Sequence, residues 1–433
     1  MISPNKQFAV IGNPILHSLS PNLFRHVFSE KKIKGNYFRI RPASAERAIF
    51  IGKKIGLCGM NVTAPFKEEI AKIANSLSMA SKKIGSVNTI LFEEAKTAGH
   101  NTDYMAVSAF LQGAFEKNQN CIVIGAGGSA RASIYAALQL SAKVKIANRS
   151  LEKAKKLAKE FGCESVSLEE VSAFIENTAV LIITIPQIED RWLKEWISPH
   201  LTVIDANYQD SSFAQKSKEL GCKVFSGKDW LIQQAIPAFT LFTEEFIEKD
   251  LFQKSLLEAM PVSTSVISLI GMMGSGKTTI GKELSRMLEY DFIDVDAEIE
   301  QTIQKSICEI FEKEGEDVFR KIEAKVLQSI LKKSSNVVIA TGGGIIAREE
   351  NRQLLRKKSL CVWLYDDLKA CTQRCKNEKT RPLLAENPYG QAEILFEQRK
   401  GWYGDSCDFL MDIHEMTPAE ASEILYEEIH RVG

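Results

Sequence analysis

The sequence predicts an α/β protein whose sheets are mainly parallel. Two stretches, residues 121–138 and 266–288, pass from an apolar, strand-like segment through a glycine-rich turn into a segment with helical spacing. Strand-like and helical segments also alternate on both sides of each turn, which is the pattern of strands joined by crossover helices. At about 150 residues per domain, a chain of 433 residues has room for two or three domains.

The composition is that of a soluble globular protein and argues against several other classes. Hydrophobic residues make up 45% of the chain and charged residues 25%, with 55 basic against 55 acidic side chains. This balance gives no sign of a nucleic-acid partner. No apolar run reaches the roughly 18 residues that a membrane span needs, and the nine cysteines form no Cys-x-x-Cys pair. We therefore expect a cytoplasmic protein with reduced thiols, no structural zinc and no membrane partner.

The charges are unevenly distributed along the chain. Basic residues outnumber acidic ones in residues 1–260, and acidic residues outnumber basic ones in the remainder. This asymmetry could favour contact between the two halves, although domains of one chain often differ in isoelectric point. A Pro-Val-Ser-Thr-Ser run at residues 261–265 has the composition of a linker. The sequence therefore predicts a linker at residues 259–265.

The second glycine-rich turn is a complete P-loop, Gly271-x4-Gly276-Lys277-Thr278. Its glycines allow successive backbone N–H groups to point inward at phosphate oxygens, at the positive end of the following helix. The lysine neutralises charge on the β- and γ-phosphates, and the hydroxyl that follows it can bind Mg²⁺. The sequence predicts a nucleoside-triphosphate site formed by Gly271, Gly274, Ser275, Gly276, Lys277, Thr278 and Thr279.

The first glycine-rich turn fits the dinucleotide fingerprint, with alanine at the third position. The next strand-like segment, residues 143–147, is followed by Asn-Arg-Ser where an acidic residue would bind the ribose 2′-hydroxyl of NAD. A guanidinium suits a 2′-phosphate, and a lysine lies one helical turn further on. NADP(H) is therefore the predicted cofactor, with two groups of binding residues: Gly125, Gly127, Gly128, Ser129 and Ala130, then Asn148, Arg149, Ser150 and Lys153.

Small polar clusters occupy the region that precedes the first turn, at residues 12–21, 59–67, 85–89 and 101–103. Each cluster alone is most often a turn or a helix cap. Four of them follow strand-like segments in front of a dinucleotide unit. Together they indicate a site for a polyhydroxylated small molecule.

Residues 7–258 resemble shikimate dehydrogenase. The matching motifs are Pro-Ile-x-His-Ser-x-Ser-Pro, Asn-Val-Thr-x-Pro-x-Lys, Ser-Val-Asn-Thr, Asn-Thr-Asp, the Gly-Ala-Gly-Gly turn and Asn-Arg-Ser. The family has an N-terminal α/β substrate domain and a Rossmann domain, and its last helices return to the first domain. The resemblance implies a substrate domain at residues 1–104 completed by 235–258, and an NADP-binding domain at 105–234.

The same resemblance implies roles for individual residues. Lys67 and Asp103 would be the catalytic pair, and Ser18 and Ser20 would hold the substrate carboxylate. A lysine beside a carboxylate can supply a proton and a positive charge to an alkoxide that develops when a ketone is reduced. Further substrate contacts are implied for Thr63, Asn88, Asp103, Tyr208 and Gln234.

Two segments depart from the family pattern. Residues 183–190 read Ile-Thr-Ile-Pro-Gln-Ile-Glu-Asp where the family has an Asn-Ala/Thr-x-x-x-Gly loop. The family's Asp-Gly-x-Gly-Met becomes Ser-Gly-Lys-Asp-Trp. Gly227 remains an implied cofactor contact, but Asp229 replaces the glycine that lets the backbone approach the nicotinamide. The alternatives for residues 1–258 are therefore a weakly active dehydrogenase, a quinate-specific one, or a module that only binds shikimate.

Residues 266–433 resemble shikimate kinase, a P-loop fold with a parallel sheet. The motifs beyond the P-loop are Asp294-Val-Asp296, Phe-Arg-Lys-Ile-Glu, Thr-Gly-Gly-Gly and Arg-Pro-Leu-Leu. Because the two aspartates alternate along an extended segment, we expect them to serve different partners. The resemblance implies that Asp294 supports Mg²⁺ through water, beside Thr278, and that Asp296 contacts the attacking hydroxyl.

Arginines and glycines complete the implied kinase site. Arg320 and Arg399 would bind the shikimate carboxylate, in a neighbourhood held in place by Glu323. Arg374 would stack on adenine, and Arg381 would belong to a mobile lid that closes over the phosphates. The catalytic residues would be Lys277, Asp296 and Arg381, and the backbone of three glycines would meet the substrate: Gly342, Gly343 and Gly344.

The sequence thus predicts a bifunctional enzyme of the chorismate route. It would reduce 3-dehydroshikimate with NADPH, and then phosphorylate shikimate with ATP and Mg²⁺ to shikimate 3-phosphate. The expected partners are small molecules only, and the expected state is a monomer or a homodimer.

Overall fold

The computed structural model of the chain describes residues 5–94, 96–112, 116–207, 211–258, 262–333, 335–375 and 388–432. The chain divides into two compact units. One contains Met1–Met60 and Glu258–Gly433, and the other contains Asn61–Leu257. Strand β3 (Leu57–Val62) crosses the division, and each unit is described below by itself.

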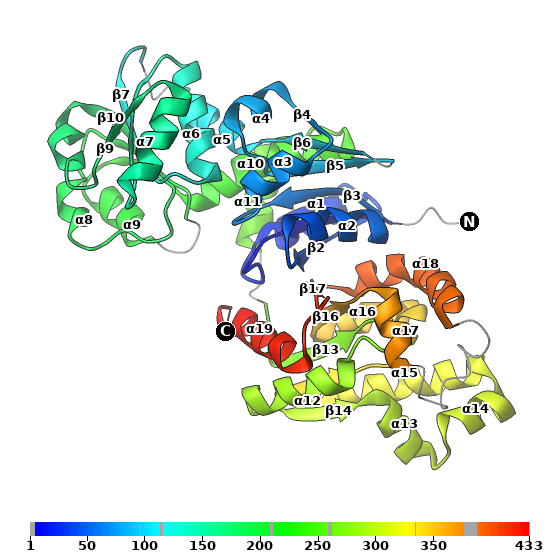
Figure 1. The fold of residues 1–433 in the computed structure, drawn as a ribbon. Helices are drawn as coiled ribbons and strands as arrows, with labels where there is room; N and C mark the ends of the chain where they lie inside the picture. The colour runs from blue at the N-terminus through cyan, green and yellow to red at the C-terminus, as the bar shows by residue number, and fades with distance from the viewer. Residues whose placement is uncertain are drawn as a thin grey trace. The chain divides into compact units, whose positions relative to one another are not determined.

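A six-stranded parallel sheet forms one part of the unit Asn61–Leu257 (Figure 1). Its strand order is β12-β11-β10-β7-β8-β9, so that the chain order reverses on either side of β7. This reversal leaves a crevice at the carboxyl ends of the central strands, which is where open α/β sheets bind ligands. The strands are β7 (Asn120–Ile124), β8 (Lys143–Ala147), β9 (Glu164–Val166), β10 (Thr178–Ile183), β11 (Thr202–Asp205) and β12 (Lys223–Phe225).

Alternate side chains of each strand point to opposite faces of the sheet, and a hydrophobic core covers each face. Cys121 and Val123 of β7 join a core with residues of α6 (Gly128–Gln139) and α7 (Leu151–Phe161). Ile122 and Ile124 join a second core with residues of the other connections. Those connections are the 3₁₀ helix η1 (Val171–Asn177), α8 (Trp192–Glu195) and α9 (Ser212–Glu219).

The rest of this unit surrounds a smaller group of strands. Strands β5 and β6 are antiparallel, and β4 runs parallel to β6. Helix α10 packs against α5, α11 and β5, so the last helices of the unit return to its first elements. The bounds are α3 (Lys67–Ile73), β4 (Ser76–Leu77), α4 (Met79–Ile84), β5 (Thr89–Glu93), β6 (Lys96–His100), α5 (Asp103–Leu111), α10 (Gly227–Thr243) and α11 (Lys249–Leu257).

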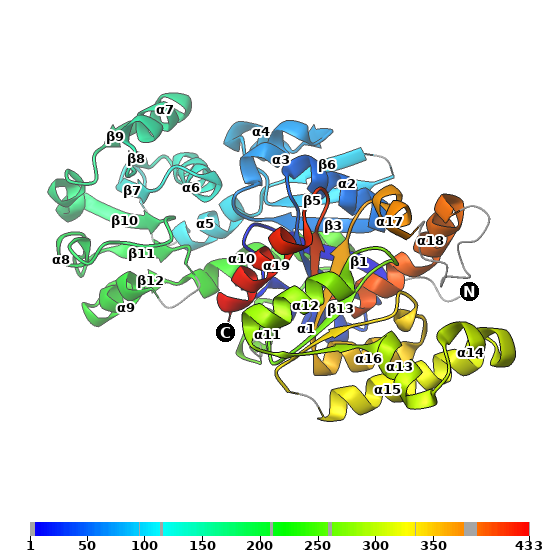
Figure 2. The same ribbon diagram turned by 60° about the horizontal axis from the view of Figure 1, so that its bottom comes forward.

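A second parallel sheet lies in the other unit, with the P-loop strand β13 at its centre. All five residues of β13 are buried, which accounts for its apolar sequence on both faces. Helix α12 packs against α19, and α15 packs against α16 (Figure 2). The strands run in the order β14-β15-β13-β16-β17: β14 (Asp291–Asp294), β15 (Val337–Ala340), β13 (Val266–Ile270), β16 (Leu360–Tyr365) and β17 (Phe409–Asp412).

The helices of this second sheet follow the strands in chain order. They are α12 (Lys277–Leu288), α13 (Val295–Ile303), α14 (Ile307–Glu314), α15 (Glu316–Lys333), η2 (Ile345–Ala347), α16 (Glu349–Lys358), α17 (Leu368–Cys375), α18 (Pro388–Ser406) and α19 (Pro418–His430).

This sheet continues into the first residues of the chain. Strand β17 pairs in parallel with β2 (Gly35–Arg41), with Leu410 opposite Ile40, and β2 pairs in parallel with β1 (Lys6–Ile11). Helices α1 (Ser20–Glu30) and α2 (Ala45–Ile55) follow β1 and β2. Contact between residues 1–60 and the C-terminal half, which the charge asymmetry only made conceivable, is therefore a main feature of this unit.

The predicted fold class is confirmed: both large sheets are α/β, and the six-stranded sheet has the predicted Rossmann order. The domain boundaries assigned from the sequence stay a prediction. Among the described residues, no helix combines the length and apolar character needed to cross a membrane.

Candidate active sites

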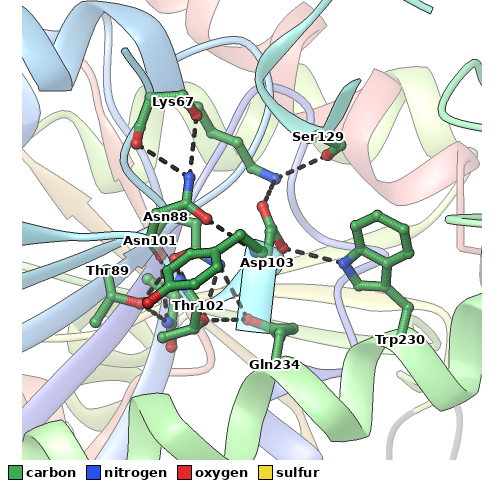
Figure 3. Close-up of polar contacts among 12 residues, drawn as sticks. Lys67, Asn88, Thr89, Asn101, Thr102, Asp103, Ser129, Trp230 and Gln234 are labelled. Carbon is green, nitrogen blue, oxygen red and sulfur yellow. Dashed lines mark hydrogen bonds and ion pairs between the residues drawn. The ribbon is translucent and has the colours of Figure 1, made fainter. Parts of the chain in front are cut away.

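Lys67 and Asp103 form an ion pair in the unit Asn61–Leu257 (Figure 3). The ammonium of Lys67, at the first residue of α3, donates to Asp103 Oδ2 at 2.7 Å and to Ser129 Oγ at 3.0 Å. The Asp103 side chain is 4% exposed and that of Lys67 is 14% exposed. A cation, a carboxylate and the first turn of α6 therefore meet at one point, where a proton can be exchanged.

The other oxygen of the same carboxylate has a partner that the sequence did not reveal. Trp230 Nε1 donates to Asp103 Oδ1 at 3.1 Å, from the first turn of α10 (Figure 3). Both carboxylate oxygens are thus engaged by fixed donors, which holds the group in one orientation. Trp230 stands where the family's Asp-Gly-x-Gly-Met motif has methionine. In the sequence, this contact was indicated only by the replacement of a thioether with an aromatic side chain that can donate a hydrogen bond.

A network of amides and hydroxyls lies beside this pair. Asn88 Nδ2 donates to Thr102 Oγ1 at 2.9 Å and to Gln234 Oε1 at 3.3 Å, and the Thr102 amide donates to Asn88 Oδ1 at 2.7 Å. Asn88 and Thr102 are buried. The structure therefore brings two predicted substrate residues together with Thr102, which belongs to the predicted polar cluster 101–103 but was given no role of its own. Thr63 lies on the turn between β3 and α3 and is partly exposed.

The two predicted carboxylate-binding serines belong to the other unit. Ser18 lies in the loop between β1 and α1, and Ser20 is the first residue of α1; both are 5% exposed. The Ser20 amide donates to Ser18 Oγ at 3.4 Å. Their place in a common pocket with Lys67 stays a prediction. Tyr208 lies outside the described residues.

The dinucleotide turn joins β7 to α6. Gly125 has a φ of +124°, and a Cβ there would lie 2.2 Å from Thr184 Oγ1. Thr184, in the segment that departs from the family pattern, donates its hydroxyl to the Ile124 carbonyl at 2.8 Å. A Cβ at Gly128 would lie 2.9 Å from Lys67 Cβ, whereas a Cβ at Gly127 would meet no other described residue within 4 Å apart from its chain neighbours. Gly128 thus lets α6 approach Lys67, and Gly127 has open space where a side chain would begin.

Two exposed cations stand at the end of β8, next to this turn. Arg149 and Lys153 are exposed, and neither forms an ion pair with any residue in the described part of the chain. Ser150 accepts a hydrogen bond from the Lys153 amide as the N-cap of α7, and Asn148 donates to the Ser150 carbonyl at 3.2 Å. A charged site with no protein partner is suited to an anionic group such as a 2′-phosphate.

Asp229 has a role that the sequence comparison did not assign. Its Oδ2 accepts hydrogen bonds from the Ser226 amide at 2.8 Å and the Ser226 hydroxyl at 2.6 Å, which forms a capping box at the start of α10. Gly227 follows Ser226 as the first residue of that helix. The carboxylate therefore satisfies backbone and side-chain donors at a helix terminus.

The P-loop has the geometry of an anion cradle. Gly271, Gly274 and Gly276 have φ values of +149°, +78° and +79°, and a Cβ at Gly274 would lie 2.2 Å from the Cys371 carbonyl oxygen. Lys277 folds back, and its ammonium donates to the carbonyl oxygens of Gly271 at 3.0 Å and Met272 at 2.9 Å. The Ser275 amide donates to the Met272 carbonyl at 3.2 Å, and α12 begins two residues later, at Lys277. The N-terminus of a helix favours phosphate through its backbone N–H groups and its dipole.

The two predicted metal-supporting residues lie together. Thr278 Oγ1 donates to Asp294 Oδ2 at 2.8 Å. The expectation that Asp294 and Asp296 share an extended segment is wrong, because β14 ends at Asp294 and Asp296 lies in the first turn of α13. Asp294 is the N-cap of that helix and accepts from the Asp296 amide at 3.0 Å. The helix turn, and not strand alternation, gives the two carboxylates different directions. A hydroxyl beside a carboxylate is a donor set that suits a hydrated Mg²⁺ ion.

A buried polar cluster follows on α15. Arg320 Nη1 donates to Glu323 Oε2 at 2.9 Å, while Glu323 Oε1 is buried and accepts no hydrogen bond from the described residues. A Cβ at Gly342 would lie 2.8 Å from Asp296 Oδ1 and 3.0 Å from Glu323 Oε1. Burial raises the pKa of Glu323 to about 7; Arg320 opposes this rise and Asp296 adds to it. The unpaired oxygen is available to a donor on a ligand.

The triple-glycine segment connects this cluster to α18. Arg399 Nη1 and the Tyr403 hydroxyl donate to the Gly343 carbonyl at 3.2 Å and 2.7 Å. Gly344 lies so close to Arg320 that a Cβ there would be 2.2 Å from Nη2. The structure thus brings the three glycines and both predicted carboxylate-binding arginines into one neighbourhood, together with Tyr403, which the sequence did not indicate.

Arg374 is tied to the P-loop from α17. Its Nη1 donates to the Gly274 carbonyl at 2.8 Å, and its Nη2 forms an ion pair with the buried Asp366 at 2.7 Å. These contacts place the guanidinium next to the glycine turn, and its contact with adenine stays a prediction. The predicted lid residue Arg381 lies outside the described residues.

Known families match both halves of the chain. The families described as "Shikimate dehydrogenase substrate binding domain" and "Shikimate / quinate 5-dehydrogenase" match residues 10–90 and 110–202, and "Shikimate kinase" matches residues 273–430. A shikimate dehydrogenase (NADP(+)) of Aquifex aeolicus is 36% identical over 253 residues, which is 56% of this chain and 93% of the relative. A shikimate kinase of Thermodesulfovibrio yellowstonii is 40% identical over 168 residues, 39% of this chain and 96% of the relative.

The chain belongs to the shikimate dehydrogenase and shikimate kinase families. The dehydrogenase part also resembles solved structures of its family. The Aquifex aeolicus shikimate dehydrogenase has a TM-score of 0.55 and 32% identity, covering 59% of this chain and 99% of that one. The Thermus thermophilus enzyme, in complex with NADP(H) and shikimate, has a TM-score of 0.53 and 27% identity, covering 59% and 100%. A quinate dehydrogenase of Corynebacterium glutamicum, at 20% identity and a TM-score of 0.53, shares the fold alone.

Proposed function

We propose that the chain catalyses two consecutive reactions. It reduces 3-dehydroshikimate to shikimate with NADPH, and it phosphorylates shikimate to shikimate 3-phosphate with ATP. The observation that carries this conclusion is the presence, in one chain, of a Lys67–Asp103 pair beside a dinucleotide turn and of a P-loop beside the Asp296–Arg320 cluster. The membership of each half in the corresponding family supports both activities, and the binding-only and quinate-specific alternatives are not favoured.

In the dehydrogenase reaction, Lys67 is the proposed proton donor. Reduction of the ketone develops negative charge on its oxygen, and an adjacent ammonium both stabilises that charge and can deliver a proton. Asp103 positions the ammonium at 2.7 Å and is itself fixed by Trp230. Ser18 and Ser20 would hold the carboxylate of the substrate, while Asn88 and Gln234 would hold ring hydroxyls.

The residues around the dinucleotide turn fit NADP(H), which supplies the hydride when bound. The glycines at the start of α6 offer backbone N–H groups to the pyrophosphate, and Gly127 leaves the space that this approach needs. Arg149 and Lys153 would bind the 2′-phosphate, because they are exposed cations at the position where NAD-binding proteins carry an acidic residue.

In the kinase reaction, Asp296 would orient the attacking hydroxyl and accept its proton. Arg320 and Arg399 would bind the shikimate carboxylate, and Gly342 leaves room for the Asp296 side chain. Lys277 and the P-loop amides would neutralise the phosphate charge, as phosphoryl transfer depends on positioning and charge stabilisation. The Thr278–Asp294 pair fits Mg²⁺, which supplies further charge neutralisation when bound.

A direct assay tests this proposal. Shikimate is incubated with the protein and NADP⁺, and then with NAD⁺ or with quinate, while the absorbance of reduced nicotinamide is followed. We expect turnover with shikimate and NADP⁺ to exceed the other combinations. Faster turnover of quinate, or no turnover of either substrate, would contradict the dehydrogenase assignment. The cytoplasmic location and the state as monomer or homodimer stay predictions.

A further inference from the structure

The loop between β1 and α1, which carries Ser18 and leads into Ser20 at the start of α1, is hydrogen-bonded to the last helix of the kinase half. Glu428, on α19, accepts hydrogen bonds from the Ile15 amide at 3.1 Å and 3.0 Å and from the Leu16 amide at 2.8 Å. All three residues are buried, with Glu428 2% exposed. The carboxylate also lies 3.4 Å from Arg41 Nε, which balances its charge. One side chain of the kinase thus satisfies two buried amides of the dehydrogenase loop.

A second connection reaches the same loop through β2. Arg39 donates from Nε and Nη2 to the Ser18 carbonyl, at 3.1 Å and 2.6 Å. The Arg39 amide in turn donates to the Asp408 carbonyl at 3.1 Å, where β17 of the kinase begins its pairing with β2. Burial lowers the pKa of His17, and the nearby charges of Arg39 and Arg431 lower it further. The loop is therefore contacted from both its amide and its carbonyl side by groups tied to the kinase.

We propose that Glu428 is a positioning residue for shikimate binding by the dehydrogenase half. This inference rests on the proposed function, in which Ser18 and Ser20 bind the substrate carboxylate. Buried backbone N–H groups are almost always hydrogen-bonded, so loss of the Glu428 carboxylate leaves the Ile15 and Leu16 amides to find water by displacing the loop. Such a displacement moves the serine hydroxyls away from the carboxylate that they bind. The affinity of the dehydrogenase for shikimate thereby depends on a residue of the kinase.

The test compares Glu428→Ala with a matched variant, Glu423→Ala, which removes an exposed glutamate from the same helix. In Glu428→Ala we expect the dehydrogenase KM for shikimate to rise about tenfold, the effect of losing a charged hydrogen-bond acceptor. The KM for NADP⁺ and the kinase kcat should stay within about twofold. Glu428→Gln keeps one acceptor oxygen and should give an intermediate KM. Glu423→Ala should leave all these values unchanged.

A double-mutant cycle with Ser18→Ala separates positioning from a general loss of stability. If Glu428 acts through the loop, its effect on KM should shrink when the Ser18 hydroxyl is already absent, because only the Ser20 hydroxyl is then left to be displaced. Additive effects, or an unchanged KM for shikimate in Glu428→Ala, would overturn the inference. If Glu428→Ala loses kinase activity as well, Glu428→Gln is judged by the same criteria. Absence of wild-type turnover with shikimate and NADP⁺ would instead contradict the proposed dehydrogenase function.

Discussion

The two glycine-rich turns both follow a central parallel strand and open a helix, but they differ in where their positive charge comes from. In the P-loop, three glycines have positive φ values and Lys277, the next residue, is the first of α12. In the turn after β7, only Gly125 has a positive φ, and the cations come from the segment after β8, with Arg149 in the loop and Lys153 in the first turn of α7. The triphosphate turn therefore carries its own cation, whereas the dinucleotide turn depends on a second segment.

The largest effect is expected at the cation within the P-loop. Lys277→Ala removes the ammonium that would neutralise the phosphates, and we expect kinase kcat to fall by about a thousandfold or more. The dehydrogenase rate of the same variant, measured with shikimate and NADP⁺, should be unaltered. A parallel fall in both rates would show that the two halves are catalytically coupled, and would contradict their separate chemistry.

A large effect confined to the other half is expected for Lys67→Ala. Loss of the proton donor should lower dehydrogenase kcat by about 10² to 10⁴. The KM for shikimate should change little, because the hydroxyl and carboxylate contacts remain. Steady-state kinetics in both directions, with kinase activity as a folding control, measures this split. If KM rises as much as kcat falls, Lys67 belongs to binding and the assignment of a catalytic pair is wrong.

The dependence of the dinucleotide turn on a second segment predicts a change in cofactor selectivity. Arg149→Ala should raise the KM for NADP⁺ about tenfold, through loss of a charged hydrogen bond to the 2′-phosphate. The KM for NAD⁺, which has no 2′-phosphate, should stay the same. Lys156→Ala, at an exposed lysine further along α7, serves as a matched control. Equal changes for both cofactors would contradict the assigned role of Arg149.

Adjacent glycines in the same turn should respond differently. Gly128→Ala places a Cβ 2.9 Å from the Lys67 Cβ, so we expect the lysine to shift and kcat to fall several-fold. Among the described residues, the Cβ of Gly127→Ala meets no atom within 4 Å beyond its chain neighbours, so this variant should act on cofactor KM and leave folding intact. Kinetic constants for the two variants distinguish these effects. The reverse pattern would contradict the described packing of α6 against Lys67.

The smallest effect concerns the stability of the kinase half. Because the folded pKa of Glu323, about 7, lies above its usual 4.5, the folded form binds a proton that the unfolded chain releases at lower pH. Its contribution to stability is therefore full below about pH 4.5 and is lost as pH rises to 7, by no more than about 3 kcal/mol.

Glu323→Gln should consequently gain thermal resistance, relative to the wild type, between pH 5 and pH 8. The temperature at which half of the kinase activity is lost reports on the unit that contains Glu323, which is formed by residues 1–60 and 258–433. A difference between variant and wild type that does not change with pH would contradict the raised pKa.

Local patterns made much of the fold and of both sites predictable. The P-loop, the turn at residues 125–130 and the Lys67 helix start each occupy one short segment, where spacing and backbone demands are visible in the sequence. The role of Trp230 was not predictable, because its contact with Asp103 joins residues 127 positions apart. The role of Asp229 was readable, since Ser-x-x-Asp before an apolar run indicates a capping box.

The contact between β2 and β17 was not predictable from local patterns. Strand β2 reads Gly-Asn-Tyr-Phe-Arg-Ile-Arg and β17 reads Phe-Leu-Met-Asp, and nothing in either pattern specifies which edge another strand will join. Glu428 was equally hidden, because it is one of several glutamates on α19 and only its burial distinguishes it. The motifs and their chemistry were therefore visible in the sequence, whereas the pairing of distant strands and the burial of single side chains became visible only in the structure.

Conversion of 3-dehydroshikimate by the intact chain, with NADPH and ATP present together, tests the central claim most directly. Mass spectrometry of the products should show shikimate 3-phosphate from the wild type, shikimate alone from Lys277→Ala, and only traces of either product from Lys67→Ala. Shikimate 3-phosphate that forms from added shikimate but never from 3-dehydroshikimate would contradict the claim that one chain performs both reactions.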